Sequence, residues 1–197
     1  MDYAVLSWIN RVFGESKFVA ILAKILSFIG GVWGMFAIVG LLLCFKKTRK
    51  IGLYVMIVGI LTWVINDLII KVIVQRNRPF VDYPELVNMC NLAGEILPTS
   101  YSMPSGHSAT AMAVAVVTMF FSKKWGGVAI GLAVLVGLSR IVLCVHYPTD
   151  VLVGFAVGVV LSIGLYYAIN LTIKIINSIR RNKNEKNSVS NKKSEQN

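Results

Sequence analysis

Residues 127–150 read GVAIGLAVLVGLSRIVLCVHYPTD, an apolar stretch that ends in a short polar turn. A helix needs about 20 mainly apolar residues to cross the hydrocarbon core of a bilayer, and the apolar part of this stretch is close to that length. Pro148 suits the first turn of a second helix, because its missing N–H is not needed there. The stretch therefore predicts two membrane helices joined by a turn, with Arg140, His146 and Asp150 gathered around it.

The rest of the chain repeats this apolar pattern. Hydrophobic residues make up 56% of the 197 positions and charged residues only 15%, which indicates a membrane protein and excludes an ordinary soluble domain. The predicted spans cover residues 31–45, 51–70, 105–121, 127–145 and 150–172. The expected fold class is therefore all-α, a polytopic membrane helical bundle.

The N-terminal segment is less regular. Charged residues interrupt the stretch from Tyr3 to Ile29, and Gly14-Glu15-Ser16 predicts a break within it. This segment is expected to form either a sixth, tilted span, giving about six transmembrane helices, or a pair of interfacial helices. Met1 to Ile9 lack the basic region and cleavage site of a signal peptide, so we expect the N-terminus to be retained.

The connections between spans are short, with one exception. The loop at about 71–104 is long enough to fold over a site, and no separate soluble domain fits elsewhere. The predicted organisation is one membrane-embedded domain over 1–176, followed by a tail over 177–197. The tail is rich in Asn, Lys and Ser, a composition typical of disorder.

Basic residues gather in the short connections on one side of the predicted bundle and in the tail. They are Lys46, Lys47, Arg49, Lys50, Lys123, Lys124, Arg180, Arg181, Lys183 and Lys186. The positive-inside rule places this side and the tail in the cytoplasm. The net charge of +11 follows from this topology, and no nucleic-acid module accompanies it, so nucleic acid is not an expected partner.

Three polar clusters lie at span ends on the opposite side, so the site is expected to face outward. The first holds Lys71 and Arg78, which are seven residues apart and would share a helix face if the helix continued. Pro79 is expected to stop that helix near Arg78. Helix ends that converge at one level of the membrane can build a single pocket. Taken alone, these two cations could be interfacial anchors.

The second cluster is Pro104-Ser105-Gly106-His107. Ser105 suits the N-cap of the following span, and Gly106 allows a ligand to approach the backbone. The free N–H groups and the positive end of the helix dipole would favour a phosphate there. His107, in the first turn, could give a proton to an oxygen that leaves the phosphorus.

The third cluster contains the other histidine of the chain. Asp150 could reach back across the helix start and hold the ring of His146. A carboxylate on one ring nitrogen fixes the tautomer and leaves the other nitrogen free to attack. Arg140 would clamp phosphate oxygens with its planar fork of donors. A lone histidine is more often structural than catalytic, but three spaced clusters on one predicted face favour catalysis.

Three further features of the sequence bear on the site. Asp67 lies four residues before Lys71, where it could form a helix-internal ion pair or position Lys71 for a phosphate. A disulfide between Cys90 and Cys144 is conceivable. The acidic residues of the external half are too scattered to suggest a metal cage, so neither a metal nor a cofactor is expected.

The three signatures, Lys-(six)-Arg-Pro, Pro-Ser-Gly-His and Ser-Arg-(five)-His-(three)-Asp, resemble those of the type 2 phosphatidic acid phosphatase superfamily, without a departure at any motif position. The resemblance implies that His146 is a nucleophile that forms a phosphohistidine, that Asp150 orients it, and that His107 is the general acid. The implied phosphate cradle consists of Lys71, Arg78, Ser105, Gly106 and Arg140.

The expected function is that of an outward-facing lipid phosphatase of the bacterial cell membrane, acting without a metal. Phosphatidylglycerophosphate and undecaprenyl diphosphate are the leading substrates that the resemblance implies, and phosphatidic acid and diacylglycerol pyrophosphate are chemically compatible. The alternative is a membrane carrier that binds a phospholipid or phosphate without hydrolysis. A lipid phosphate and the bilayer are the expected partners, and the sequence predicts no oligomeric state.

Overall fold

A computed structural model describes residues 1–194, without the side chains of residues 186 and 188–194, and every element that it assigns in this part of the chain is a helix. The chain divides into two units, Met1–Ile163 and the part from Gly164 onward. Every predicted site residue belongs to the first unit.

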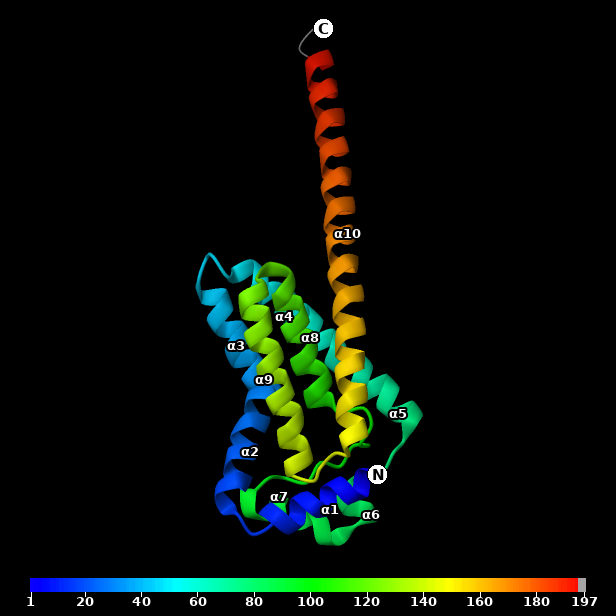
Figure 1. Ribbon diagram of the computed structural model, residues 1–197. Coiled ribbons are helices and arrows are strands. Elements are labelled where there is room, and N and C mark those ends of the chain that lie inside the picture. Colours follow the sequence, from blue (N-terminus) through cyan, green and yellow to red (C-terminus); the bar gives the residue numbers. More distant parts are fainter. Residues whose placement is uncertain (195–197) are drawn as a thin grey trace. The chain divides into compact units, whose positions relative to one another are not determined.

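The helices follow one another along the chain as labelled in Figure 1. They are α1 (Asp2–Phe13), α2 (Lys17–Gly30), α3 (Val32–Cys44), α4 (Arg49–Val64), the π-helix η1 (Ile65–Ile70), α5 (Lys71–Val74), α6 (Pro79–Asp82), the 3-10 helix η2 (Pro84–Val87), α7 (Asn88–Ala93), α8 (Gly106–Phe121), α9 (Lys123–Val142) and α10 (Pro148–Ser194).

By length and composition, three helical runs of the described chain can cross a membrane. They are Arg49–Asp82, Lys123–Val142 and Pro148–Glu185. A fourth crossing forms if α2 and α3, bent by 54° at their junction, count as one span, and α8 is a shorter apolar helix. The predicted all-α membrane bundle is confirmed. Two of the predicted spans are too short to be counted by themselves: α3, at 31–45, has 13 residues and reaches a crossing length only together with α2, and α8, at 105–121, has 16 residues.

The N-terminal segment breaks where the sequence predicts. Helix α1 ends before Gly14, and the Ser16 hydroxyl caps α2 by accepting a hydrogen bond from the backbone N–H of Val19 at 3.4 Å. Figure 1 shows α1 lying across the end of the bundle, next to α6 and α7. Leu6 and Ile9 of α1 are buried in one hydrophobic cluster with Leu86, Ile141, Cys144, Tyr147 and Val151. The segment is therefore not a single tilted span, since α1 covers the bundle end and α2 belongs to the bent pair.

Glycines let α10 approach α8 closely. A Cβ atom on Gly154 would lie 2.7 Å from the backbone oxygen of Ser105, and one on Gly158 would lie 2.4 Å from that of Ala109. The backbone N–H of Ser105 also donates to the backbone oxygen of Asp150 at 3.0 Å. These contacts hold the start of α8 against the start of α10. The second cluster lies at the start of α8, and Asp150 of the third cluster lies at the start of α10.

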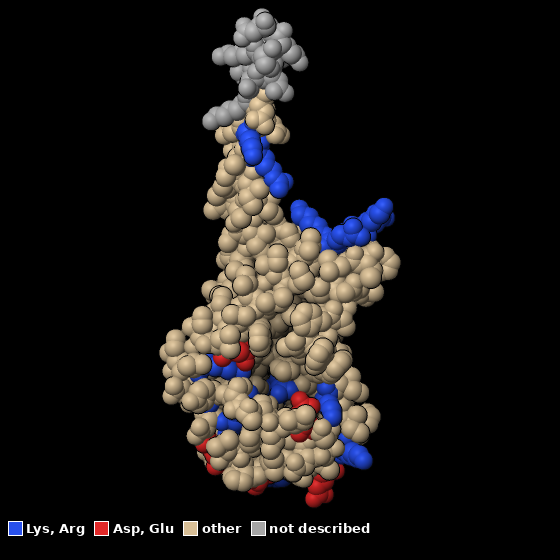
Figure 2. All heavy atoms as spheres, turned by 180° about the vertical axis from the view of Figure 1, so that it is seen from behind, with Lys and Arg blue, Asp and Glu red and all other residues tan. Residues whose placement is uncertain are grey.

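The distribution of charge on the first unit fits a membrane bundle. Figure 2 shows Asp and Glu, together with part of the Lys and Arg, around the end that holds the short helices, further Lys and Arg at the opposite end, and a surface between them that is almost free of charge. Many large hydrophobic side chains of the first unit are exposed, among them Phe36, Leu41 and Leu132. Such side chains need an apolar surrounding, which a bilayer supplies.

The structure continues α10 as a helix to Ser194, and residues 195–197 lie outside the described part of the chain. The expected disorder of the tail stays a prediction. Lysine and arginine are good helix formers, and an Arg181–Glu185 ion pair at 2.9 Å spans one turn of this helix. Cys90 and Cys144 are buried free thiols, so the conceivable disulfide is not formed.

Candidate active site

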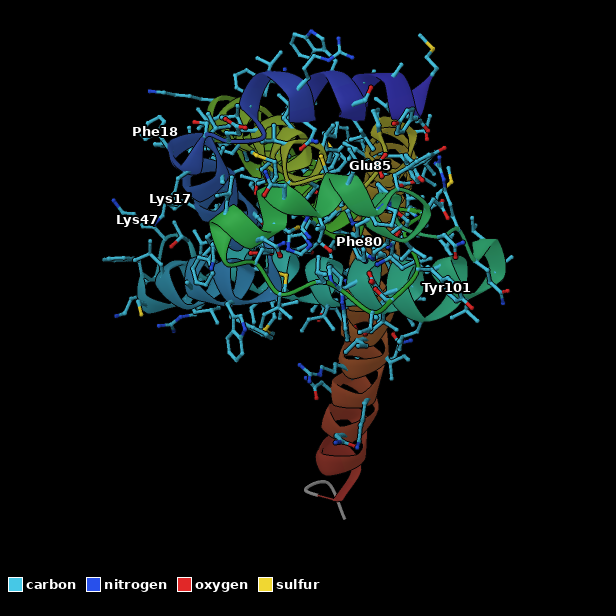
Figure 3. The ribbon with its side chains drawn as sticks, turned by 90° about the horizontal axis from the view of Figure 1, so that it is seen from below. Lys17, Phe18, Lys47, Phe80, Glu85 and Tyr101 are labelled. Carbon is cyan, nitrogen blue, oxygen red and sulfur yellow. The ribbon has the colours of Figure 1, made fainter. Side chains whose placement is uncertain are left out.

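The three sequence clusters meet at one cavity of about 140 Å³ in the first unit. The predicted residues that line it are Lys71, Arg78, Gly106, His107, Arg140 and His146. The other two, Ser105 and Asp150, are fully buried and hydrogen-bonded to one another through their backbones. The chain thus brings all eight predicted residues together. Figure 3 looks onto this end of the bundle, where Phe80 and Glu85 mark the segment that passes over it between α5 and α8.

Lys71 reaches the cavity from the end of a π-helix. Its Nζ atom lies 2.5 Å from Oδ1 of Asp67, and its side chain is 4% exposed. The neighbouring Asn66 donates from Nδ2 to Oδ2 of Asp67 at 3.1 Å and to the backbone oxygen of Pro104 at 3.3 Å. The expected ion pair is therefore present, and Asp67 also lines the cavity. The π-helix, a form that often occurs at functional sites, therefore ends with Asp67 and Lys71 both at the cavity.

Arg78 arrives by a different route from the one expected. Helix α5 ends at Val74, and Gln75 adopts a left-handed conformation with φ of 51°, so Lys71 and Arg78 do not share one helix. The Arg78 guanidinium group is instead held by carbonyl oxygens. It donates to Ser100 at 2.7 Å and to Val145 at 2.9 Å. These contacts fix a group that carries five donors and remains charged, which suits a phosphate clamp.

Arg140 comes from the last turn of α9 and is 2% exposed. Its Nη1 atom donates to the Ser27 hydroxyl and lies 3.3 Å from Oε1 of Glu95. Within the described residues its buried Nε has no hydrogen-bond partner. A buried donor without a partner is costly, so an anion that enters the cavity would stabilise this side chain.

His146 is held less directly by Asp150 than the sequence predicts. Its Nδ1 atom lies 3.6 Å from Oδ2 of Asp150, which is beyond hydrogen-bond range, and 3.3 Å from the hydroxyl of Ser102. That hydroxyl donates to the same carboxylate oxygen at 2.5 Å. Asp150 also accepts the backbone N–H of Tyr147 at 2.9 Å, which is the predicted contact across the helix start, and Arg76 at 2.7 Å.

The other ring nitrogen of His146 faces a cation. Its Nε2 atom lies 3.3 Å from Nη1 of Arg78. Because a guanidinium group can only donate, Nε2 must be the unprotonated nitrogen, and the proton resides on Nδ1. Burial lowers the pKa of His146 well below its ordinary range, and the nearby charges of Arg78, Arg140 and Lys71 lower this pKa further. The ring is therefore neutral near pH 7, and Nε2 keeps a lone pair directed toward the cations.

The start of α8 supplies the remaining wall. Ser105 occupies the predicted N-cap position, although its hydroxyl does not cap the helix but accepts a hydrogen bond from Ser108 at 3.0 Å. Gly106 has no room for a side chain, since a Cβ atom there would lie 2.6 Å from Oδ2 of Asp67. His107 is half-buried, and a Cβ atom on Gly31 would lie 3.2 Å from its Nε2 atom, so the bend between α2 and α3 borders this ring.

Sequence reasoning missed several residues around the site. Ser102 and Arg76 contact Asp150, Ser27 contacts Arg140, and Asn66 supports Asp67. Serine, arginine and asparagine next to a motif carry no spacing signal, so only the fold reveals them. Glu95, which pairs with Arg140, is different: acidic residues are rare in this chain, and its charge is a signal from which a cationic partner could have been predicted.

Within the described residues, no group of three or more His, Cys, Asp or Glu side chains could hold a metal ion. The expectation that no metal takes part remains a prediction.

Comparison with known proteins agrees with the motifs. The family model of the PAP2 superfamily matches residues 47–174. The chain is 38% identical over 123 residues to an undecaprenyl-diphosphatase of Sulfolobus acidocaldarius, covering 61% of this chain and 56% of that protein. It is 33% identical over 138 residues to phosphatidylglycerophosphatase B of Bacillus subtilis, covering 64% and 62%. The matches thus span less than two thirds of these curated relatives.

Two solved structures have a similar fold. The PAP2 type phosphatidylglycerolphosphate phosphatase from Bacillus subtilis gives a TM-score of 0.68 at 25% identity, covering 86% of this chain and 84% of that one. LpxE from Aquifex aeolicus gives 0.65 at 22% identity, covering 84% and 94%. The family match includes all three motif clusters and well over half of the sequence, and we conclude that the chain belongs to the PAP2 superfamily.

Proposed function

We propose that this chain is an integral membrane lipid phosphatase that removes the terminal phosphate of phosphatidylglycerophosphate or undecaprenyl diphosphate through a phosphohistidine, without a metal ion. The observation that carries the proposal is the position of His146, whose buried ring places Nε2 3.3 Å from Nη1 of Arg78 in a cavity that is also lined by Lys71, Arg140 and His107. Simple binding of a phosphate would need the three cations but not this nucleophile.

The proposed reaction begins when the terminal phosphate enters the cradle. Its oxygens take hydrogen bonds from Arg78, Arg140 and Lys71, which stabilise the charge of the transition state. Nε2 of His146 attacks phosphorus, an N–P bond forms, and the bond from phosphorus to the lipid oxygen breaks. His107, which must be in its protonated form for this step, gives that oxygen a proton and becomes neutral. A water molecule, losing a proton to His107, then hydrolyses the phosphohistidine and releases inorganic phosphate.

We further propose that the site faces the outside of the cell membrane. The basic residues at 46–50 and 123–124 lie where α3 is followed by α4 and where α8 is followed by α9, and Figure 1 shows both places at the end of the bundle away from α1, α6 and α7. The positive-inside rule assigns such connections to the cytoplasm. The substrate phosphate then stands at the outer surface while its acyl or prenyl chain stays in the bilayer.

The test is phosphate release by the full chain, purified in detergent with excess EDTA, from each of the two lipids. We expect release by the wild type and none by His146→Ala, and we expect acid-labile label on the wild-type protein during turnover of a labelled substrate. Ser162→Ala is the matched control, because Ser162 is a fully buried serine whose hydroxyl bonds only the backbone of its own helix, at Val159.

Binding without release in the wild type would indicate the carrier instead, and release that needs added magnesium would overturn the metal-free mechanism. The ratio of rates ranks the lipids, with phosphatidic acid and diacylglycerol pyrophosphate as further candidates.

A further inference from the structure

We propose that Ser102 is a positioning residue, whose hydroxyl group connects the carboxylate of Asp150 to the ring of His146 and so sets the tautomer for attack. The inference rests on the proposed phosphatase function. Ser102 lies outside the three motif clusters, two residues before Pro104, and its side chain is fully buried. Nothing in its sequence position marks it as part of the site.

Among the described residues, Ser102 is the side chain whose hydroxyl group contacts both His146 and Asp150. Oδ2 of Asp150 is 3.6 Å from Nδ1 of His146, whereas the Ser102 hydroxyl is 2.5 Å from the former and 3.3 Å from the latter. A carboxylate near neutral pH can only accept, so the single hydroxyl proton of Ser102 is donated to Asp150. The oxygen of Ser102 is then free to accept the Nδ1 proton of His146.

An independent contact gives the same direction. Arg78 donates toward Nε2 of His146 at 3.3 Å, which requires the ring proton to be on Nδ1. The hydrogen bonds therefore run in one sense, from Arg78 to the ring, from the ring to Ser102, and from Ser102 to Asp150. Reversal of any one of them would leave a donor facing a donor or an acceptor facing an acceptor.

Asp150 is itself held in place from the other side. Its Oδ1 atom accepts a hydrogen bond from Nη1 of Arg76 at 2.7 Å. The same guanidinium group pairs with Asp2 at 2.9 Å and lies 3.9 Å from the centre of the Tyr147 ring. With one oxygen fixed by Arg76 and the other by the Tyr147 N–H, the carboxylate cannot readily turn toward His146 if Ser102 is removed.

The link matters at the step in which the N–P bond forms. Nε2 gives its electron pair to phosphorus while Nδ1 keeps its proton, so the ring becomes positively charged. The Ser102 oxygen stabilises that proton, and Asp150 polarises the hydroxyl that does so. Ser102 does not contact the substrate in this scheme, so its loss should slow attack and leave binding of the lipid phosphate nearly unchanged.

The experiment compares Ser102→Ala with the wild type in detergent, measuring kcat, KM and the rate of phosphoenzyme formation after rapid mixing. We expect kcat and the formation rate to fall about 10- to 100-fold, with KM within about threefold, because a misdirected ring reacts slowly although the cradle is intact. Ser102→Thr, which keeps the hydroxyl, should recover most of the rate. Ser162→Ala, a buried serine away from the site, should match the wild type.

A double-mutant cycle tests the link even if Thr does not fit. If Ser102 acts through Asp150, then Asp150→Asn combined with Ser102→Ala should be no slower than Asp150→Asn alone. Losses that multiply, or a Ser102→Ala enzyme within twofold of the wild type, would overturn the inference. A wild type that releases no phosphate from any lipid would instead mean that the proposed function is wrong.

Discussion

Replacement of Gly154 by alanine tests whether the site depends on the close approach of α8 and α10. A Cβ atom there would lie 2.7 Å from the backbone oxygen of Ser105, about 0.7 Å inside ordinary van der Waals contact. Since that oxygen is backbone, one helix must move away from the other. Overpacking of this kind costs about 1–3 kcal/mol, and the better helix propensity of alanine returns about 1 kcal/mol. A net destabilisation of up to about 2 kcal/mol follows.

The same displacement acts on catalysis. It separates Ser105 from Asp150, whose backbones are joined at 3.0 Å, and a shift of this size in a reacting geometry can slow a reaction by about 10- to 100-fold. The assay is phosphate release together with thermal unfolding in detergent. Gly131→Ala on α9 is the matched control, because a Cβ atom there meets nothing within 4 Å, so this variant should be as active as the wild type and slightly more stable. If Gly154→Ala behaved like Gly131→Ala in both assays, the helices would not be in the contact described.

Three other results are expected. Asp67→Asn should raise KM about tenfold, a loss of ~1.4 kcal/mol in binding free energy, because the Lys71 ammonium group loses the carboxylate that holds it at 2.5 Å. Unchanged KM and kcat would show that the pair has no role in the reaction. Arg140→Lys should lower kcat/KM by about 100-fold or more, since an ammonium group cannot reproduce the fork of donors, and a variant within threefold of the wild type would argue against a clamp. Stability should fall as pH falls below 6.5, because the depressed pKa of His146 lets the unfolded chain bind the proton first. Unfolding curves of His146→Gln that are just as steep with pH would contradict it.

The sequence was most informative where apolar length and motif spacing coincide. Residues 127–150 predict a span, a turn and a second helix that begins at Pro148, and the structure has all three. The same holds for the break at Gly14-Glu15-Ser16. In these places residues close in the sequence determine the backbone conformation, because proline, glycine and a capping serine act within one turn of the chain.

The sequence was least informative where a contact depends on helix packing. The spacing of Lys71 and Arg78 suggested one helix, but the chain turns at Gln75, and the side chains meet because both ends return to the same cavity. Ser102 and Arg76 acquire their partners only when the third cluster folds against them. No periodicity reports such contacts, since the residues involved lie more than 40 positions apart in the chain.

The π-helix at Ile65–Ile70 sets the rotational phase of the chain that follows it. An α-helix turns by about 100° for each residue, and a π-turn accommodates one additional residue without advancing that phase in the usual way. Deletion of a single residue within this segment would therefore restore an ordinary α-turn and leave Lys71 on nearly the same side of the helix. A deletion between Asp67 and Lys71 would instead change the spacing of this ion pair, which spans four positions.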